Sequence, residues 1–281
     1  MNAHDLILLT LQASVMAGVF ALGLEAKVQD VTFVLRHPAL LLRSLLAMFV
    51  AMPLLALLLG HVFDLALPTQ IALMCLAVSP VPPLLPKKQD KAGGHSSYAL
   101  GLMVCTAILS LAIIALWAQV LDRIFGRAFA MALGPIALLV IKMIVLPLAV
   151  GMALRALAPT LTVRLTRPAI LVAGWLLPLG GVVVLYAAHS ALLALMGNGT
   201  LIALMVFIAA GLLIGHLLGA PGRDEKIVLA MSTASRHPGV AIGLATANFP
   251  DNRQVPALIL LYLVLGILAT LAYMKWQQSS A

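Results

Sequence analysis

Long apolar runs follow one another along this chain with only short polar segments between them. Hydrophobic residues make up 63% of the 281 residues and charged residues 9%, whereas a soluble domain carries about a quarter charged residues. The first run, 6–24, is long enough to cross a bilayer core of about 30 Å. It has no small-residue cleavage site and no basic region before it, so we expect a retained helix rather than a signal peptide. The pattern predicts an all-α polytopic membrane protein.

The spacing of the polar segments predicts about nine transmembrane helices in one membrane domain over 1–281. Most Lys and Arg residues of the short loops fall on one side of the expected helices, and Arg123, Arg127 and Arg253 fall on the other. By the positive-inside rule, this places the N-terminus outside and the C-terminus in the cytoplasm, in the inner (plasma) membrane. The expected helices lie near residues 6–24, 38–60, 69–95, 97–121, 130–154, 169–188, 199–219, 226–249 and 255–275.

Two of these nine segments contain residues that interrupt a helix. The third has four prolines between residues 80 and 86, and a helix cannot continue through them because proline lacks the backbone N–H. The eighth has Arg236 and His237 directly before Pro238 and Gly239. Two interrupted segments in corresponding halves are typical of transporters built from inverted repeats, with the binding site where the breaks meet. The alternative is that both are loops between shorter helices.

The order and spacing of several short segments resemble the bile acid:sodium symporter family over nearly the whole chain. The two interrupted segments fall where that family has its crossing helices. The other segments that carry the resemblance are Gly23-Leu24-Glu25 with Asp30, His37-Pro38, Met52-Pro53-Leu54 and Ile141-Lys142-Met143-Ile144-Val145-Leu146-Pro147.

This resemblance implies secondary transport of a small organic anion by alternating access around two broken, crossing helices. It also implies the nine-helix bacterial form, with an inverted-repeat core domain beside a panel domain. In the family, the crossing helices bind sodium ions and the substrate lies between core and panel. The expected panel helices are at approximately 6–24 and 130–188, and the expected core helices at approximately 38–121 and 199–275.

Most of the sodium ligands that the resemblance implies do not carry over to this chain. Where the family has a Glu, a Gln and an Asn in the eighth span, this chain has Ser232, Arg236 and His237. The family's Gln from an early helix falls at Met48, and Thr106 retains one hydroxyl. Because a guanidinium is always charged and accepts no cation, we hypothesise that at least one sodium site is lost and that Arg236 stands in for the ion. Sodium and protons both remain candidate coupling ions, and no other cofactor is indicated.

A charged residue within a span is a functional hypothesis by default, although an arginine can also snorkel to the membrane interface. Arg236 beside the break could hold a carboxylate with two nitrogens. His237 could carry a proton or bond to nearby backbone. The other predicted substrate-binding residues are Ser79, His95, Ser96, Ser97, Ser232, Ser235 and Pro238, and the ion-binding candidates are Ser232 and Thr106. An anion funnel, or ordinary positive-inside loop charge, is expected at Lys87, Lys88 and Lys91.

Other function classes fit the sequence poorly. Neither a His-Glu-x-x-His nor a Gly-x-Ser-x-Gly motif is present, so we expect no enzyme and no metal site. A net charge of +8 spread over short loops fits membrane topology better than nucleic-acid binding. A sodium-independent or proton-coupled carrier or exporter of the same fold remains open, with a membrane-embedded enzyme as a remote alternative. The expected partners are membrane lipid and a small organic anion, and the oligomeric state is not predicted.

Overall fold

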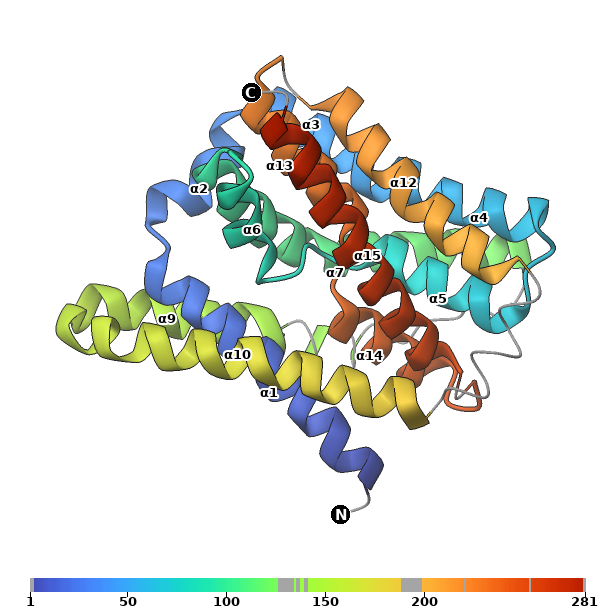
Figure 1. The fold of residues 1–281 in the computed structure, drawn as a ribbon, viewed down its shortest axis with the longest axis horizontal. Helices are drawn as coiled ribbons and strands as arrows, with labels where there is room; N and C mark the ends of the chain where they lie inside the picture. Colours follow the sequence, from blue (N-terminus) through green and yellow to red (C-terminus); the bar gives the residue numbers. More distant parts are fainter. Residues whose placement is uncertain are drawn as a thin grey trace.

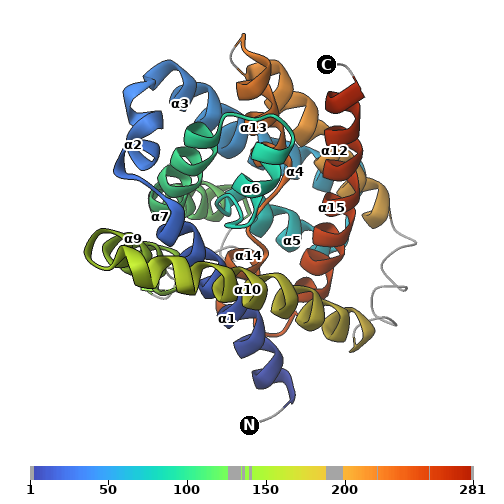
Figure 2. The ribbon, with the colours of Figure 1, turned by 60° about the vertical axis from the view of Figure 1, so that its left-hand side comes forward.

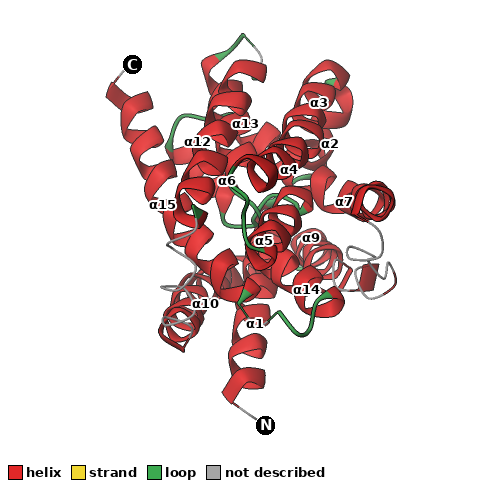
Figure 3. Ribbon diagram, turned by 90° about the vertical axis from the view of Figure 1, so that its right-hand side faces the viewer, coloured by secondary structure: helices red, strands yellow, loops and turns green. Residues whose placement is uncertain are grey.

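The computed structural model describes residues 3–125, 134, 137–138, 141–187, 199–219, 221–252 and 254–279. These residues form helices joined by short loops, with no strand among them (Figure 3). In chain order the elements are α1 (Ala3–Glu25), α2 (Val28–Arg36), α3 (Pro38–Leu45), the π-helical segment η1 (Leu46–Ala51), α4 (Met52–Val62), α5 (Leu67–Val78), α6 (Leu85–Lys91), α7 (Ser96–Phe125), the π-helical segment η3 (Ile141–Val145), α9 (Leu146–Leu157), α10 (Pro159–Ala187), α12 (Thr200–Leu218), α13 (Arg223–Ala234), α14 (Pro238–Asn248) and α15 (Val255–Ser279).

Four helical stretches in the described residues are long and apolar enough to cross a membrane. They coincide with four of the predicted spans, and two shorter apolar helices, Gln12–Glu25 and Leu67–Val78, accompany them. Several long stretches of this kind in one chain are typical of a multi-pass membrane protein. The four stretches are Pro38–Val62, Ser96–Val120, Thr200–Leu218 and Val255–Ser279.

Two helices differ from the boundaries expected from the sequence. Helix α2 is an additional short helix in the first predicted loop, and the Asp30 carboxylate accepts the Lys27 backbone N–H at 3.0 Å near its start. Helix α10 begins at Pro159 rather than near residue 169, since proline suits the first turn of a helix. Arg127, Arg253 and part of the predicted span 130–154 lie outside the described residues.

Helices α1, α9 and α10 pack together as one group, in the lower half of Figures 1 and 2. Helices α1 and α9 meet almost backbone to backbone: a Cβ atom on Gly23 would lie 2.5 Å from the Leu148 carbonyl oxygen. The Ser14 hydroxyl of α1 donates to the Ala173 carbonyl of α10 at 2.8 Å. Membrane helices associate through such close contacts at small residues and through hydrogen bonds between helices.

Most of the remaining helices form a second group that is drawn above the first in Figure 1, and α14 lies at the height of α10. Within it, α12 and α13 pack closely, and a Cβ atom on Gly215 would lie 2.5 Å from the Ala230 Cα. Helix α15 belongs to the second group, where it packs against α5, α12 and α14, and it also contacts α10 of the first group. The marked N- and C-terminal ends lie at opposite ends of the molecule in both views (Figures 1 and 2).

Each π-helical segment ends two residues before a proline. Segment η1 ends at Ala51 before Pro53, and η3 ends at Val145 before Pro147. Because Pro53 has no N–H, the carbonyls four and five residues earlier lose a helical donor. The nearer of these carbonyls, that of Phe49, accepts the indole N–H of Trp117 at 2.8 Å. The farther one belongs to Met48 and faces the candidate site.

Candidate functional site

The two predicted helix breaks are both present, and they touch. Helix α5 ends at Val78 and α6 begins at Leu85, so the proline run lies between them. Helix α13 ends at Ala234 and α14 begins at Pro238. The backbone N–H of His237 donates to the Pro80 carbonyl at 2.9 Å, which joins the second break directly to the first.

Arg236 lies at this junction and is 1% exposed. Its Nη1 donates to the Ser79 carbonyl at 3.2 Å and its Nη2 to the Met48 carbonyl at 2.5 Å. The guanidinium carbon also lies 5.6 Å from the centre of the Phe49 ring, within range of a cation–π contact. Since Ser79 follows the last turn of α5, the positive charge lies at the partly negative end of a helix. Both terminal nitrogens therefore have backbone acceptors, where the sequence had suggested a substrate carboxylate.

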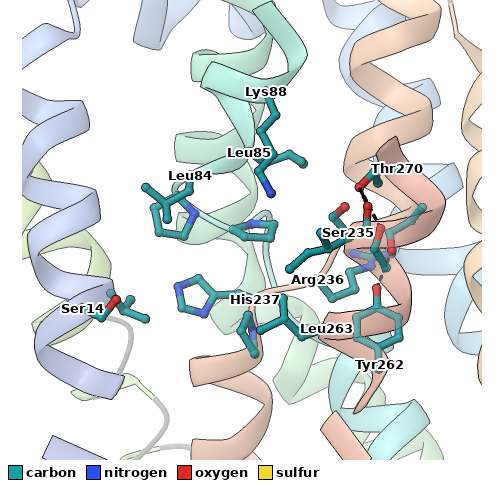
Figure 4. A pocket seen from close by; sticks show the side chains of 17 residues that line it. Ser14, Leu84, Leu85, Lys88, Ser235, Arg236, His237, Tyr262, Leu263 and Thr270 are labelled. Carbon is teal, nitrogen blue, oxygen red and sulfur yellow. Dashed lines mark hydrogen bonds between the residues drawn. The ribbon is translucent and has the colours of Figure 1, made fainter. Parts of the chain in front are cut away.

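His237 is fully buried beside Arg236 and begins α14. Its Nδ1 accepts the Val240 backbone N–H at 3.2 Å, which satisfies one of the free N–H groups in the first turn of that helix. Its Nε2 has no hydrogen-bond partner in the described part of the protein. In Figure 4 the ring faces the space between the second break and Ser14 of α1.

That space is a cavity of about 100 Å³, called here the central cavity. Its walls are largely apolar, and four hydroxyl groups, one amine, one guanidinium and one imidazole line it, with no carboxylate among the described lining residues. Figure 4 shows Lys88 pointing into it from α6. The lining residues with polar side chains are Ser14, Lys88, Ser235, Arg236, His237, Tyr262 and Thr270.

Of the other predicted site residues, Ser235 and Pro238 line the central cavity, whereas Ser79, Ser232 and Thr106 do not. Ser232 accepts a hydrogen bond from the Gln89 amide at 2.8 Å, between α13 and α6. The hydroxyl of Ser79 donates to the Leu76 carbonyl. Thr106 lies on α7, next to the first break, and its hydroxyl oxygen accepts the Val81 N–H at 3.5 Å. These three hydroxyls satisfy polar groups around the breaks.

The predicted residues at the start of α7 lie outside the central cavity. The His95 Nδ1 accepts the Tyr98 backbone N–H at 3.2 Å. Ser97 donates to Asp30 of α2 at 2.8 Å, and Ser96 donates to Asp90. His95 therefore caps the start of α7, and Ser97 and Ser96 hydrogen-bond it to Asp30 and Asp90.

The three lysines of the predicted funnel have three different environments. Lys87 forms an ion pair with Glu25 at the end of α1, with 2.9 Å between Nζ and Oε2. Lys88 lines the central cavity. Lys91 is exposed and borders a second hollow together with Arg223 and Asp224. Of the three, Lys88 is therefore the one that could meet a ligand in the central cavity.

Four residues near the site were missed in the sequence. Ser14 and Thr270 are single hydroxyls within apolar runs, a weak signal that many structural residues share. Tyr262 of α15 is buried, and its hydroxyl donates to the Ala234 carbonyl at 2.5 Å, at the end of α13. The buried Gln89 amide donates to the Val228 carbonyl at 2.9 Å as well as to Ser232. Gln89 was missed because it lies among charged residues after the proline run, where an exposed side chain is expected.

Residues 14–196, more than half of the chain, match the sodium bile acid symporter family. The chain belongs to this family. It is therefore a multi-pass membrane protein of a transporter family, in agreement with its apolar helical stretches. A comparison with curated proteins gives no match. The range matched to the sodium bile acid symporter family includes the first break and η1, and it ends before Ser232, Arg236 and His237.

The family name raises the question of whether these residues suit sodium, a hard cation that binds through oxygen atoms. The Ser79 and Met48 carbonyls at the junction already accept from Arg236, and no carboxylate lines the central cavity in the described residues. A guanidinium at this point also repels a second cation. The described residues of the junction therefore do not fit a sodium ion. The described residues also contain no group of three or more His, Cys, Asp or Glu that could hold a metal.

Proposed function

We propose that this protein is a secondary transporter of a small organic anion, and that the Arg236 guanidinium takes the place of a transported sodium ion. The observation that carries the proposal is the central cavity. It combines apolar walls with Lys88, Arg236 and His237 and has no carboxylate among its described lining residues. Such a lining favours a ligand with an apolar body and a negatively charged head.

The N-terminus of α14 also favours a ligand with a negatively charged head. Helix α14 has 11 residues, and its first turn begins at the cavity edge with His237 and Pro238. The partial positive charge of a helix start favours an anion there. Lys88 adds a full positive charge from the facing helix α6.

The size of the central cavity supports a small substrate. Pockets for drug-sized ligands measure roughly 300–1,000 Å³. The central cavity holds about 100 Å³ in this conformation. A compact carboxylate or sulfonate therefore fits this state better than a sterol.

We propose alternating access between two helix groups as the transport mechanism. Helices α1, α9 and α10 would form the panel, and the helices around the two breaks would form an inverted-repeat core within one nine-helix domain. The support is that α1 borders one side of the central cavity while the breaks border the other. The two helix breaks, one after α5 and one after α13, support an internal repeat within that core. Opposite ends for the two termini agree with an external N-terminus and a cytoplasmic C-terminus in the inner membrane.

The test is uptake of labelled small organic anions into proteoliposomes. Lys88→Gln should reduce uptake at least tenfold, because a charge partner of the anion is lost. Lys91→Gln is the matched control: it removes the same charge from the same short helix, but at an exposed position outside the central cavity. Equal loss in both variants, or no uptake of any anion by the wild type, would contradict the proposal.

A further inference from the structure

We infer that His237 binds the anionic head of the substrate as a neutral hydrogen-bond donor, through Nε2–H. In this role the ring stays neutral and does not move a coupling proton across the membrane. This inference rests on the proposed function, because it names the group that contacts the transported anion. It is carried by the different surroundings of the two ring nitrogens.

The Nδ1 atom of His237 must be the bare nitrogen of the ring. It lies 3.2 Å from the backbone nitrogen of Val240, whose N–H points at it. A neutral imidazole has one N–H and one accepting nitrogen, so an accepting Nδ1 places the proton on Nε2. Adding a proton to Nδ1 would set two N–H groups against each other and remove the cap of α14.

The Nε2 atom has the opposite surroundings. His237 is 0% exposed, and Nε2 has no acceptor in the described part of the protein. The ring lines the central cavity and faces it in Figure 4. A buried N–H without an acceptor is unfavourable. A hydrogen bond from this N–H to a ligand acceptor therefore contributes more binding free energy than the same bond at an exposed position.

The groups around His237 also disfavour its use as a proton carrier. The titratable side chains that face the central cavity are Lys88 of α6, Arg236 of the second break and Tyr262 of α15, while α1 contributes Ser14 and Val15. No carboxylate among these described residues could exchange a proton with the ring. An imidazolium would add a positive charge to a cavity that already contains an amine and a guanidinium.

Two substitutions separate the cap from the donor. In His237→Asn, the side-chain oxygen can still accept the Val240 N–H, since asparagine is a favoured N-cap, but no group replaces Nε2–H. In His237→Gln, the longer amide can place an N–H near the position of Nε2 but caps poorly. Each purified protein is titrated with benzoate, and with benzamide as the uncharged control, while the midpoint of thermal unfolding is followed.

We expect His237→Asn to keep the ligand-free midpoint and to bind benzoate about tenfold more weakly, as for the loss of one hydrogen bond to a charged group. His237→Gln should unfold at a lower temperature and keep most of the affinity. Wild-type affinity in His237→Asn, or equal losses in both variants, would overturn the inference. If neither benzoate nor any anion of the uptake panel stabilises the wild type, the proposed function itself fails.

The tautomer can be read without any ligand. Nitrogen-15 spectra of histidine-labelled protein, assigned by comparison with His237→Asn, should show a bare Nδ1 and a protonated Nε2 from about pH 6 to pH 8. An imidazolium, or a proton on Nδ1, in this range would contradict the inference whatever the substrate is.

Discussion

Arg236 donates from Nη2 to the carbonyl oxygen of Met48 at 2.5 Å, and the two residues are 188 positions apart in the chain. The resemblance set out in the sequence analysis implies that the family has sodium-binding glutamines at both of these positions. The structure brings these two positions into contact. A guanidinium and a backbone carbonyl form here the kind of cation–oxygen contact that an ion and its ligand would form.

Replacing Arg236 should destabilise the protein strongly. In Arg236→Gln, the carbonyls of Ser79 and Met48 lose charged donors in a buried place, and leaving two such groups unsatisfied costs about 2–5 kcal/mol. The measurement is the midpoint of thermal unfolding in detergent. The matched control is Arg43→Gln at an exposed position of α3, which should change the midpoint little. Equal midpoints for the two variants would mean that Arg236 does not join the breaks.

The buried contact between Gln89 and Ser232 should hold α6 to α13. In Gln89→Leu, the amide that donates to both the Val228 carbonyl and Ser232 is lost, which should cost about 1–3 kcal/mol. Ser232→Ala removes one acceptor and should cost less. Thermal unfolding of both single variants and the double variant gives their coupling, and additive losses would show that the two side chains act independently.

The close contact between α12 and α13 predicts a low tolerance for side chains at Gly215. A Cβ atom there would lie 2.5 Å from both the Ala230 Cα and the Leu229 carbonyl oxygen, so Gly215→Ala must push the helices apart. Such overpacking costs about 1–3 kcal/mol. Gly174→Ala on α10 is the matched control, because a Cβ atom there meets nothing within 4 Å. The prediction fails if the two variants unfold at the same temperature.

The ion pair between Glu25 and Lys87 links α1 to α6, but both side chains remain partly exposed, at 40% and 33%. Solvent therefore weakens it, and Lys87→Gln should lower stability by less than about 1 kcal/mol. The small loss should disappear at high salt. Thermal unfolding at low and high ionic strength checks this, and a loss that persists at high salt would contradict it.

The positions of the helix breaks could be predicted because they depend on local chemistry. The prolines after Ser79 and the pair Pro238-Gly239 prevent a regular helix wherever the surrounding chain lies. The start of α10 could not be placed as well, because Arg164 and Arg167 suggested a loop and instead lie exposed on the helix. Charge alone does not separate a loop from the polar end of a long helix.

The partners of Arg236 could not be predicted, because they are backbone atoms. The Ser79 carbonyl is free to accept because α5 ends there, and the Met48 carbonyl because a proline follows η1. The residue types serine and methionine by themselves do not indicate that their carbonyls are free. The lysine cluster was ambiguous for a similar reason. Lys87 and Lys88 are neighbours on α6, but their side chains point in different directions. Lys87 pairs with Glu25 of α1, and Lys88 lines the central cavity.

The most direct test of the central claim is exchange of a small organic anion across proteoliposomes that contain the same salt on both sides. Vesicles are loaded with unlabelled anion, and the entry of labelled anion is measured in sodium chloride and in choline chloride at equal ionic strength. A carrier whose resident cation is Arg236 should exchange the anion at the same rate in both salts. Exchange that requires sodium would contradict the role given to Arg236, and a lack of exchange in both salts would contradict anion transport.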